Sequence, residues 1–330
     1  MDPVSEDLGV GAAPEAMRAT TRFPTWVRRS LGGDGAGAGR WGATQAIVRD
    51  FHLETICESA LCPNRRECWS HGNVSLMILG SVCTRRCAFC AVTTGRPPPV
   101  DPQEPWRVAR AIARLPLRYV VITAPARDDL PDQGAGQFAT TVRAIKACAP
   151  LVGIEVLTPD FHARPERITQ VVEAGPDVYS HNLETVRRLT PSVRPQAQYD
   201  RSLAVLARAH RVGAGRVTTK SGIMVGLGER PDEVRTVMQD LRRVGCELLT
   251  VGQYLQPTPR QRRVVEFVPL ARYAEYREWG LALGFRQVAS GPYVRSSYNA
   301  HEALTVVGGS RRETPDVSSA LDPCVWKETT

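Results

Sequence analysis

Six of the nine cysteines of this 330-residue chain lie between residues 57 and 90, where they form two triplets. The first triplet has the spacing CX4CX5C and consists of Cys57, Cys62 and Cys68. The second triplet has the spacing CX3CX2C, within the run CTRRCAFC, and consists of Cys83, Cys87 and Cys90. The apolar run NVSLMILG between the triplets is typical of a buried strand. Two triplets on either side of one strand suggest two metal centres that lie close together.

A site with three cysteines is one ligand short of the usual metal centre. Structural zinc takes four protein ligands in a closed tetrahedron, and an iron–sulfur cluster normally takes four thiolates. Each triplet therefore needs a fourth ligand from a distant part of the chain, or it leaves one metal position open for chemistry. Zinc knuckles and disulfides are the alternatives. Neither triplet supplies the paired CX2C units of a zinc site, and no secretory signal accompanies the cysteines, whereas cytosolic thiols stay reduced.

Strand-like and helix-like runs alternate from Asn73 onward. The strand-like runs are Val74–Leu79, Tyr119–Thr123, Gly153–Leu157, Val178–Asn182, Thr218–Val225 and Leu248–Gly252. The helix-like runs are Glu104–Leu115, Gln137–Cys148, Pro165–Ala174, Tyr199–Val212, Pro231–Val244 and Leu270–Leu283, and a short helix is predicted over Ala43–Glu54. This alternation predicts parallel βα units in an α/β fold. Six units are fewer than the eight of a closed TIM barrel, and periodicity alone does not distinguish a partial barrel from a doubly wound sheet.

The second triplet carries a resemblance to a known family. CX3CX2C with an aromatic residue, Phe89, before its last cysteine resembles the signature of radical S-adenosylmethionine (SAM) enzymes. Both triplets together resemble the lipoyl synthase family. The agreement continues through CPNRRECW, RDDLPD, IEVLTPDF, HNLETV, KSGIMVGLGE, GQYLQP and VRSSYNA, and it covers roughly Pro24 to Ala300.

The resemblance implies a fold and a division of the chain. The fold is the partial (β/α)6 TIM-like barrel of radical SAM enzymes, with N-terminal and C-terminal extensions. We expect a disordered tail over residues 1–23, an extension with the first triplet over 24–72, the barrel over 73–285, and a C-terminal extension with RSSY and a polar tail over 286–330. In barrels of this kind the site forms at the carboxyl ends of the strands, and the second triplet directly follows the first strand.

The resemblance also implies cofactors and roles for the cysteines. The second triplet would hold a [4Fe–4S] cluster whose open iron binds SAM, which on reduction yields a 5′-deoxyadenosyl radical. The first triplet would hold an auxiliary [4Fe–4S] cluster, with Ser297 of RSSY as its fourth ligand. That cluster would donate the sulfur inserted at C6 and C8 of a protein-bound octanoyl-lysine.

Four further residues are candidates for cofactor contacts: Phe89, Glu155, Asn182 and Lys220. The last three lie at or near the ends of predicted strands, where site residues concentrate in barrels. Each could equally be a cap, a turn residue or a buried polar group with internal partners.

The partners follow from the same resemblance. They are an octanoylated lipoyl carrier domain, either a 2-oxoacid dehydrogenase E2 or a glycine cleavage H protein, and a small electron donor such as ferredoxin or flavodoxin. The net charge of +8 fits an acidic partner surface. No basic run interleaves with aromatic residues as in nucleic-acid binders, and no apolar run reaches the length of a membrane span. We expect a cytoplasmic enzyme without nucleic-acid or membrane partners.

One loop departs from the family pattern. The family usually has Ser-Val-Asp before RDDL, where this chain has Ala124-Pro125-Ala126. It usually has a histidine after DGGA, where this chain has Gly136-Gln137 after Asp132-Gln133-Gly134-Ala135. The departure allows a paralogue that acts on another acyl chain or carrier. A biotin-synthase-like or methylthiotransferase-like enzyme and a zinc-binding interaction module are further alternatives.

Overall fold

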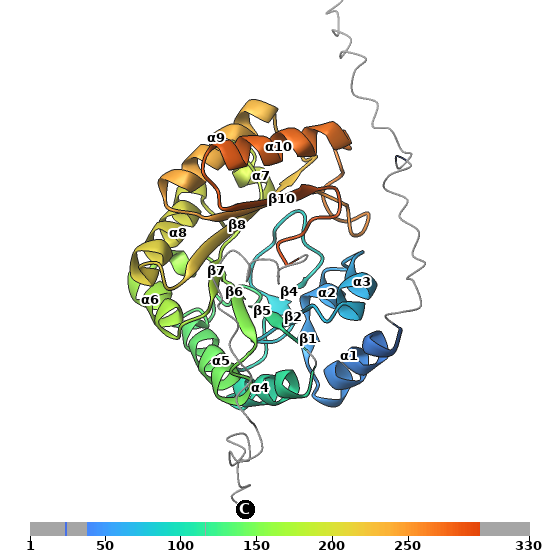
Figure 1. Cartoon of the computed structure of the whole chain (residues 1–330), viewed down its shortest axis with the longest axis vertical. Coiled ribbons are helices and arrows are strands. Elements are labelled where there is room, and N and C mark those ends of the chain that lie inside the picture. Colours follow the sequence, from blue (N-terminus) through green and yellow to red (C-terminus); the bar gives the residue numbers. More distant parts are fainter. Residues whose placement is uncertain (1–23, 25–37, 116, 298–330) are drawn as a thin grey trace, which may run out of the picture.

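An eight-stranded sheet with helices along its outer side organises the chain (Figure 1). The computed structural model describes Pro24 and residues 38–115 and 117–297; the predicted tail 1–23 and residues 298–330 of the C-terminal extension lie outside these ranges. The sheet consists of β1 (Glu54–Thr55), β2 (Val74–Met77), β5 (Tyr119–Thr123), β6 (Gly153–Leu157), β7 (Val178–Ser180), β8 (Thr218–Val225), β9 (Leu248–Gln253) and β10 (Gln287–Gly291). Two short strands, β3 (Val82–Cys83) and β4 (Thr93–Thr94), pair separately.

The sheet is the open barrel that was expected. The strands run in the order β1-β2-β5-β6-β7-β8-β9-β10, and every neighbouring pair is parallel except β1 with β2. Within the described ranges no pairing joins β1 to β10, so the barrel does not close. All six predicted strands are present. The sheet also takes in β10, which lies in the predicted C-terminal extension, and β1, which lies in the N-terminal extension.

The outer helices cover the strands. They are α4 (Glu104–Arg114), α5 (Ala135–Cys148), α6 (Pro165–Glu173), α8 (Tyr199–Gly213), α9 (Pro231–Arg243) and α10 (Leu270–Ala282), with α7 (Thr190–Val193) and the 3-10 helix η4 (Phe161–Ala163) in the loops. Each of the six helices predicted between the strands is present within two residues of its predicted bounds. The strands beneath them are mostly buried, β5 and β9 along their whole length, because parallel strands are covered on both faces.

The N-terminal extension packs beside β2 and consists of α1 (Ala38–Asp50), α2 (Ile56–Ser59) and α3 (Arg65–Ser70) (Figure 1). The helix predicted over Ala43–Glu54 is observed as α1 and is displaced toward the N-terminus, because Glu54 pairs as a strand with β2. The rings of Trp41 and Trp69 lie 5.1 Å apart and join α1 to α3. Asn64 donates a hydrogen bond of 2.6 Å to the Tyr293 carbonyl, so this extension meets the segment after β10.

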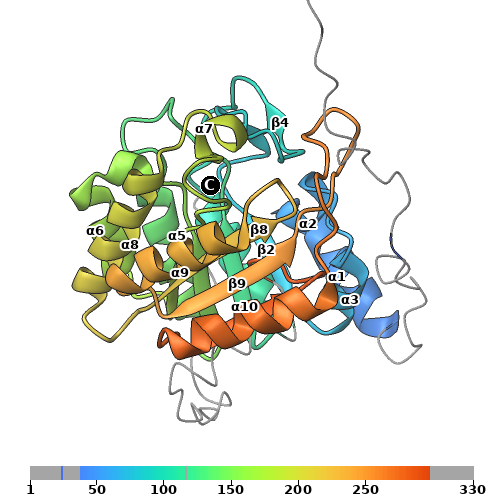
Figure 2. The ribbon, with the colours of Figure 1, turned by 90° about the horizontal axis from the view of Figure 1, so that it is seen from above.

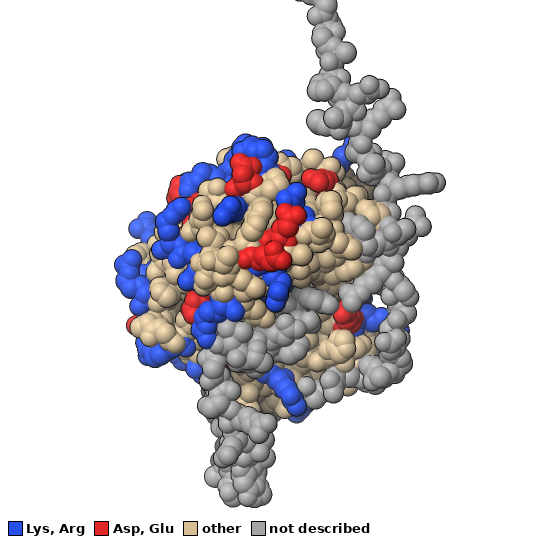
Figure 3. All heavy atoms as spheres, turned by 45° about the horizontal axis from the view of Figure 1, so that its top comes forward, with Lys and Arg blue, Asp and Glu red and all other residues tan. Residues whose placement is uncertain are grey.

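Arginine supplies almost all of the basic side chains of this chain. Figure 3 shows basic side chains with acidic ones interspersed among them. Several exposed arginines pair with carboxylates, as Arg187 does with Asp200 and Arg188 with Glu233. Such exposed pairs contribute little to folding, so the charge bears on association more than on stability. Among the residues that the structure describes, no helix is long and apolar enough to cross a membrane.

Candidate functional site

A cavity of about 540 Å³ lies toward the carboxyl ends of the strands, inside the open arc of strands seen in Figure 1; Figure 2 shows the same barrel from the side. Its lining includes Thr123, Leu157 and Asn182 at or just after the ends of β5, β6 and β7, and Gly222 and Thr250 within β8 and β9. It also includes Cys57 and Cys62 of the first triplet, all three cysteines of the second triplet, and Ser297. The fold therefore brings residues from both ends of the chain to one chamber, which is largely apolar. A chamber of this kind accommodates a small molecule or an acyl arm.

The loop of the second triplet is held by backbone hydrogen bonds from several βα loops. Thr84 N–H donates to the Ala126 carbonyl at 3.0 Å, and Ala88 N–H donates to the Val193 carbonyl at 2.8 Å. Arg262 N–H in turn donates to the Ala88 carbonyl at 2.7 Å. These contacts fix the loop without using side chains of the cysteines, which stay available for a metal.

The first triplet is carried by the two short helices of the extension. Cys57 lies on α2, whose first turn is capped by the Thr55 hydroxyl, and Cys62 follows it, with its N–H donating to the Cys57 carbonyl at 3.0 Å. Cys68 lies on α3 and is half-buried against the core; it does not line the cavity. Two of the three first-triplet cysteines therefore face the same chamber as the second triplet.

The six cysteines of the two triplets are free thiols, so the structure contains none of the disulfides considered as an alternative. Burial raises the pKa of Cys57 to about 11 and of Cys90 to about 12, and burial also raises the pKa of Cys87. These thiols are protonated at neutral pH until a metal displaces the proton. No three Cys, His, Asp or Glu side chains of the described part converge on a single ion; in a cluster, each thiolate binds a different iron.

Asn182 presents an unpaired acceptor to the cavity. Its Nδ2 donates to Glu184 Oε1 at 3.0 Å and to Ser296 Oγ at 2.5 Å, but its buried Oδ1 has no hydrogen-bond partner among the described residues. A Cβ on neighbouring Gly222 would lie 2.9 Å from that oxygen and 2.6 Å from Thr250 Oγ1, so only glycine leaves the space open. An orphaned acceptor in an apolar chamber is a group that a bound polar ligand would satisfy.

Arg194 supplies a buried positive charge at the same place. The side chain is 8% exposed, lines the cavity and donates from Nη1 to the Asn182 and Leu183 carbonyls at 3.0 Å each. Its Nε has no hydrogen-bond partner within the described ranges. A guanidinium with spare donors can bind a carboxylate. Our sequence reading missed Arg194, because it lies in a turn after α7 and not at a strand end.

His181 is a neutral, fully buried histidine of the lining. Nδ1 lies 2.9 Å from the Thr158 carbonyl, so it carries the proton, and Nε2 lies 3.0 Å from the Ser202 hydroxyl. Burial, and to a smaller extent the nearby Arg194 charge, lowers the pKa of His181 to about 4. Both ring nitrogens are engaged, which makes this residue a structural support of the site.

Glu155 and Lys220 bind each other and do not line the cavity. Lys220 Nζ lies 2.9 Å from Glu155 Oε2, which also accepts a hydrogen bond of 3.0 Å from the Tyr119 hydroxyl. Both side chains are almost wholly buried inside the barrel. Their predicted contact with the cofactor therefore stays a prediction. Phe89, in contrast, lines the cavity.

The segment after β10 reaches the cavity from the other end of the chain. Val294, Arg295, Ser296 and Ser297 line it, and Ser297 is half-buried. Arg295 donates to the Val294 carbonyl at 2.7 Å and is close enough to Cys62 for their charges to interact. Ser297 thus lines the same cavity as Cys57 and Cys62 of the first triplet. Tyr298 lies outside the described residues.

The altered loop contacts the second triplet through its backbone. Ala124, Pro125 and Ala126 line the cavity, but Ala126 uses its carbonyl for Thr84 and its N–H for Cys83 Sγ, at 3.3 Å. Gln137 does not line the cavity; its amide donates to the Asp101 carbonyl and Glu104 Oε2 at 2.9 Å each. In this chain the altered loop therefore contacts the cysteine loop through backbone atoms of Ala126.

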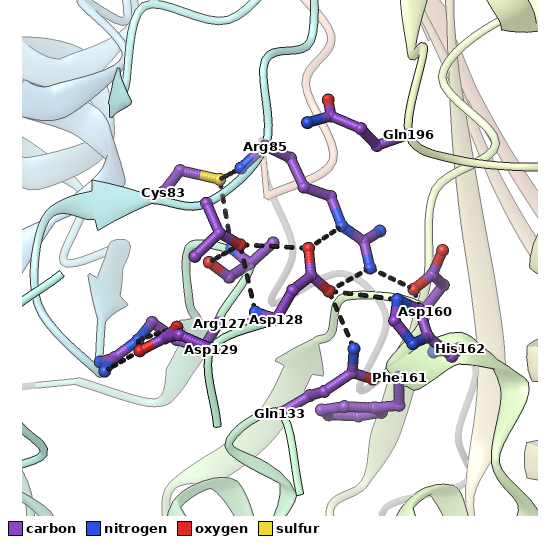
Figure 4. Close-up of polar contacts among 12 residues, drawn as sticks. Cys83, Arg85, Arg127, Asp128, Asp129, Gln133, Asp160, Phe161, His162 and Gln196 are labelled. Atoms are coloured by element: carbon purple, nitrogen blue, oxygen red, sulfur yellow. Dashed lines mark hydrogen bonds and ion pairs between the residues drawn. The ribbon is translucent and has the colours of Figure 1, made fainter. Parts of the chain in front are cut away.

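In the sequence, the RDDL segment (residues 127–130) served only as evidence of the family resemblance. In the structure its side chains hold the loops of this region together (Figure 4). Arg127 is 2% exposed and donates to the Leu79 and Pro98 carbonyls at 3.0 Å each. Asp128 binds Arg85, which lies inside the second triplet. The arginines and aspartates of these loops were the main residues that sequence reasoning missed, because nothing in the spacing of single charges predicts which of them meet.

Curated relatives match most of the chain. It is 52% identical over 279 residues to a lipoyl synthase of Thermus thermophilus, which covers 84% of this chain and 85% of the relative. It is 55% identical over 285 residues to a lipoyl synthase of Pyrobaculum calidifontis, which covers 85% of this chain and 96% of the relative. The family model of the radical SAM superfamily matches residues 77–241.

A solved structure of a protein with low sequence identity to this chain has a similar fold. The X-ray structure of the FeFe-hydrogenase maturase HydG from Carboxydothermus hydrogenoformans superposes with a TM-score of 0.50 at 13% identity. The match covers 82% of this chain and 79% of that one. At this identity the likeness concerns the fold alone.

Proposed function

Because the chain belongs to the lipoyl synthase family of radical SAM enzymes, we propose that its two cysteine triplets divide one reaction between them. The activity is that of a sulfurtransferase: radical SAM-dependent insertion of two sulfur atoms at C6 and C8 of a protein-bound octanoyl-lysine, with two [4Fe–4S] clusters as cofactors. One observation supports this division of roles: cysteines of both triplets and Ser297 line the same cavity.

The donors present fit the two clusters. Cys83, Cys87 and Cys90 would hold the cluster that binds SAM, and Cys57, Cys62, Cys68 and Ser297 would hold the auxiliary cluster. With these groups bound, SAM supplies a 5′-deoxyadenosyl radical that removes hydrogen from unactivated C–H bonds, and the auxiliary cluster supplies sulfur. The chain's own residues orient the groups through the polar side chains of the lining and exclude water, since most of the lining surface is apolar.

We propose that SAM lies against Phe89, Asn182 and Arg194. The Arg194 guanidinium has spare donors for a carboxylate, and Asn182 Oδ1 lacks a partner. Phe89 offers an apolar wall from the loop of the second triplet. Glu155 and Lys220 would support the site indirectly, as a buried pair that keeps the strands beneath Asn182 and Gly222 in register. Direct contact of either side chain with SAM would require the pair to separate.

We propose that the substrate is the octanoylated lipoyl domain of a 2-oxoacid dehydrogenase E2 or a glycine cleavage H protein. The octanoyl-lysine arm would enter the apolar chamber, where both triplets reach it. A small electron donor, ferredoxin or flavodoxin, would reduce the cluster of the second triplet. We place the enzyme in the cytoplasm, where thiols stay reduced, because both triplets must remain free thiols to bind iron.

The function is tested by mass spectrometry of an octanoylated carrier incubated with reconstituted enzyme, SAM and a reductant. We expect the lipoyl product, and we expect carriers with shorter or longer acyl chains to react at least tenfold more slowly. Preference for another acyl chain would favour the paralogous enzyme. That alternative draws support only from the altered loop, whose contacts to the second triplet run through the backbone.

The roles of the triplets are tested separately. Replacing Cys57, Cys62 or Cys68 by alanine should abolish the lipoyl product and leave part of the reductive SAM cleavage, which needs only the other cluster. Complete loss of SAM cleavage in a folded variant that still binds iron would contradict independent roles.

A further inference from the structure

Arg85 forms the centre of a buried ionic network beside the second triplet (Figure 4). Its Nε and Nη2 bind the two carboxylate oxygens of Asp128 at 2.7 Å each, and Nη2 also binds Asp160 Oδ1 at 2.8 Å. Arg201 Nε binds the other oxygen of Asp160 at 2.8 Å. Two arginines thus balance two aspartates. Arg85 is 8% exposed, and the Asp160 side chain is not exposed at all.

Stability alone is a weak explanation for such a network. Removing charges from water costs several kcal/mol per ion, and a buried ion pair often stabilises a fold no more than apolar side chains of the same size would. Its distinctive effect is on geometry, because a two-bond arginine–carboxylate pair fixes both partners in one orientation. The partners here belong to the cysteine loop and to the loop after β5, so the network fixes those two loops against each other.

The two loops meet at one sulfur atom. Arg85 N–H donates to Cys83 Sγ at 3.4 Å from within the cysteine loop, and Ala126 N–H donates to the same sulfur at 3.3 Å from the loop after β5. The Thr84 hydroxyl ties the loops together, donating to the Ala126 carbonyl at 2.9 Å and accepting from Asp128 N–H at 3.1 Å. The ionic network therefore lies directly behind the two amides that point at Cys83.

Amide donors on a cluster ligand affect the ease of reduction. Hydrogen bonds to the sulfurs of an iron–sulfur cluster are among the factors that set its reduction potential. Reduction adds an electron, and an N–H dipole directed at the ligand sulfur stabilises the added negative charge. Losing such donors should therefore make the cluster harder to reduce.

We propose that Arg85 is a positioning residue, whose bonds to Asp128 and Asp160 hold two amide donors on Cys83 Sγ and thereby raise the reduction potential of the cluster at the second triplet. This inference rests on the proposed function, since it takes that triplet as the cluster ligands. Arg85 itself need not touch SAM or substrate for this role.

The test is an electron paramagnetic resonance titration of the full chain, reconstituted with iron and sulfide, in which Cys57, Cys62 and Cys68 are alanine so that one cluster reports. Asp128→Asn is added to this background. We expect the midpoint potential to fall by 59 mV or more, which is a tenfold shift in the reduction equilibrium of a one-electron couple. If Asp128 acted only through its charge, its loss would raise the midpoint potential. The direction of the shift therefore distinguishes this charge effect from the loss of the positioned amide donors.

Asp129→Asn is the matched control, because Asp129 is the adjacent carboxylate and binds Arg127 instead of Arg85. It should leave the potential unchanged. Arg85→Lys keeps the positive charge but loses the two-bond geometry, and it should also lower the midpoint potential. This variant serves as the test if the Asp128→Asn protein does not bind a cluster. An unchanged or raised potential in the loaded variants would overturn the inference. Absence of any cluster signal in the alanine background would instead contradict the proposed ligands themselves.

Discussion

Individual side chains make the cavity suitable for metal chemistry by being buried and poorly partnered. Burial keeps the cysteine thiols neutral, leaves Asn182 Oδ1 without a partner and holds Arg194 as a cation among backbone carbonyls. The unpaired acceptor and the buried cation cost free energy in the empty chamber, and a polar ligand would relieve that cost, whereas the neutral thiols lose their protons only when a metal binds. The residues of the site are therefore arranged for ligands more than for the stability of the fold.

Ser297 offers the first prediction at this scale. A serine oxygen is a harder ligand than a thiolate and suits iron less well, so the iron it holds is released more easily when sulfur is donated. Ser297→Cys should keep its iron yet form lipoyl product at least tenfold more slowly, and Ser297→Ala should lose both iron and product. Ser290→Ala on β10, which does not line the cavity, is the control for iron content. Wild-type rates in both Ser297 variants would rule out the ligand role.

His181 makes folding stability depend on pH. Its pKa is lowered from 6.5 to about 4 in the folded chain, so between these values the unfolded chain binds a proton that the folded chain does not. The contribution of His181 is complete above pH 6.5 and is lost as the pH falls. We expect the free energy of unfolding of the metal-free chain to drop by about 2 kcal/mol between pH 6.5 and 5 from this residue alone.

The measurement is urea unfolding at the two pH values. His181→Gln should remove about that much of the pH-dependent loss. His210→Gln, at an exposed histidine on α8, should retain the wild-type loss. An equal loss in the His181 variant and the wild type would contradict this assignment.

At the scale of elements, the site depends on loops and short helices from opposite ends of the chain. The helices α2 and α3 bring the first triplet, the loop after β2 brings the second, and the segment after β10 brings Ser297. The long strands and outer helices form the frame on which these short pieces are placed. Their mutual contacts are few, and Asn64 provides one of them.

Asn64 joins the N-terminal extension to the segment after β10 through its bond to the Tyr293 carbonyl. Asn64→Ala removes a buried hydrogen bond, worth about 1 kcal/mol. We expect amide hydrogen exchange in residues 291–297 to accelerate about fivefold, because the segment would open more often. Asn73→Ala is the control, since Asn73 Nδ2 has no hydrogen-bond partner among the described residues. Equal exchange in the Asn64 variant and the wild type would show that the segment is held by other contacts.

At the scale of the whole molecule, the open barrel explains how two metal centres share one chamber. A sheet of eight strands that does not close leaves room beside β2 for the N-terminal extension, and the segment after β10 returns to the same opening (Figure 1). The cavity therefore has the parallel strand ends as its floor and both chain extensions as parts of its wall. With the cluster ligands proposed above, one chamber would let the acyl arm meet both centres without leaving.

Iron content is the prediction that belongs to the whole chain. Two [4Fe–4S] clusters amount to about eight irons per chain. Replacing the three cysteines of the second triplet by alanine should leave about four irons and no SAM cleavage. Cys246→Ala, at a cysteine buried away from the cavity, should keep the wild-type iron content, as measured by colorimetric iron and sulfide assays. Loss of a cluster in the Cys246 variant would make the assignment of ligands wrong.

The sequence by itself determined the features that depend on local pattern. The strand and helix periodicities predicted all six barrel strands and their covering helices, because burial imposes an apolar pattern on each element wherever it lies. The two cysteine triplets and RSSY identified the family before any fold was known. The exception was α1, whose start at Ala38 has no apolar periodicity to mark it.

Tertiary structure alone decided which charged side chains meet. Glu155 and Lys220 were predicted near strand ends as cofactor contacts, but they lie within β6 and β8 and pair with each other across β7 inside the barrel. Arg85 and Asp160 are 75 residues apart and pair only because their loops lie at the same end of the sheet. A single charge carries no periodic signal, and its partner is set by the three-dimensional path of the chain, since ionic contacts depend on distance in space and not on separation in sequence.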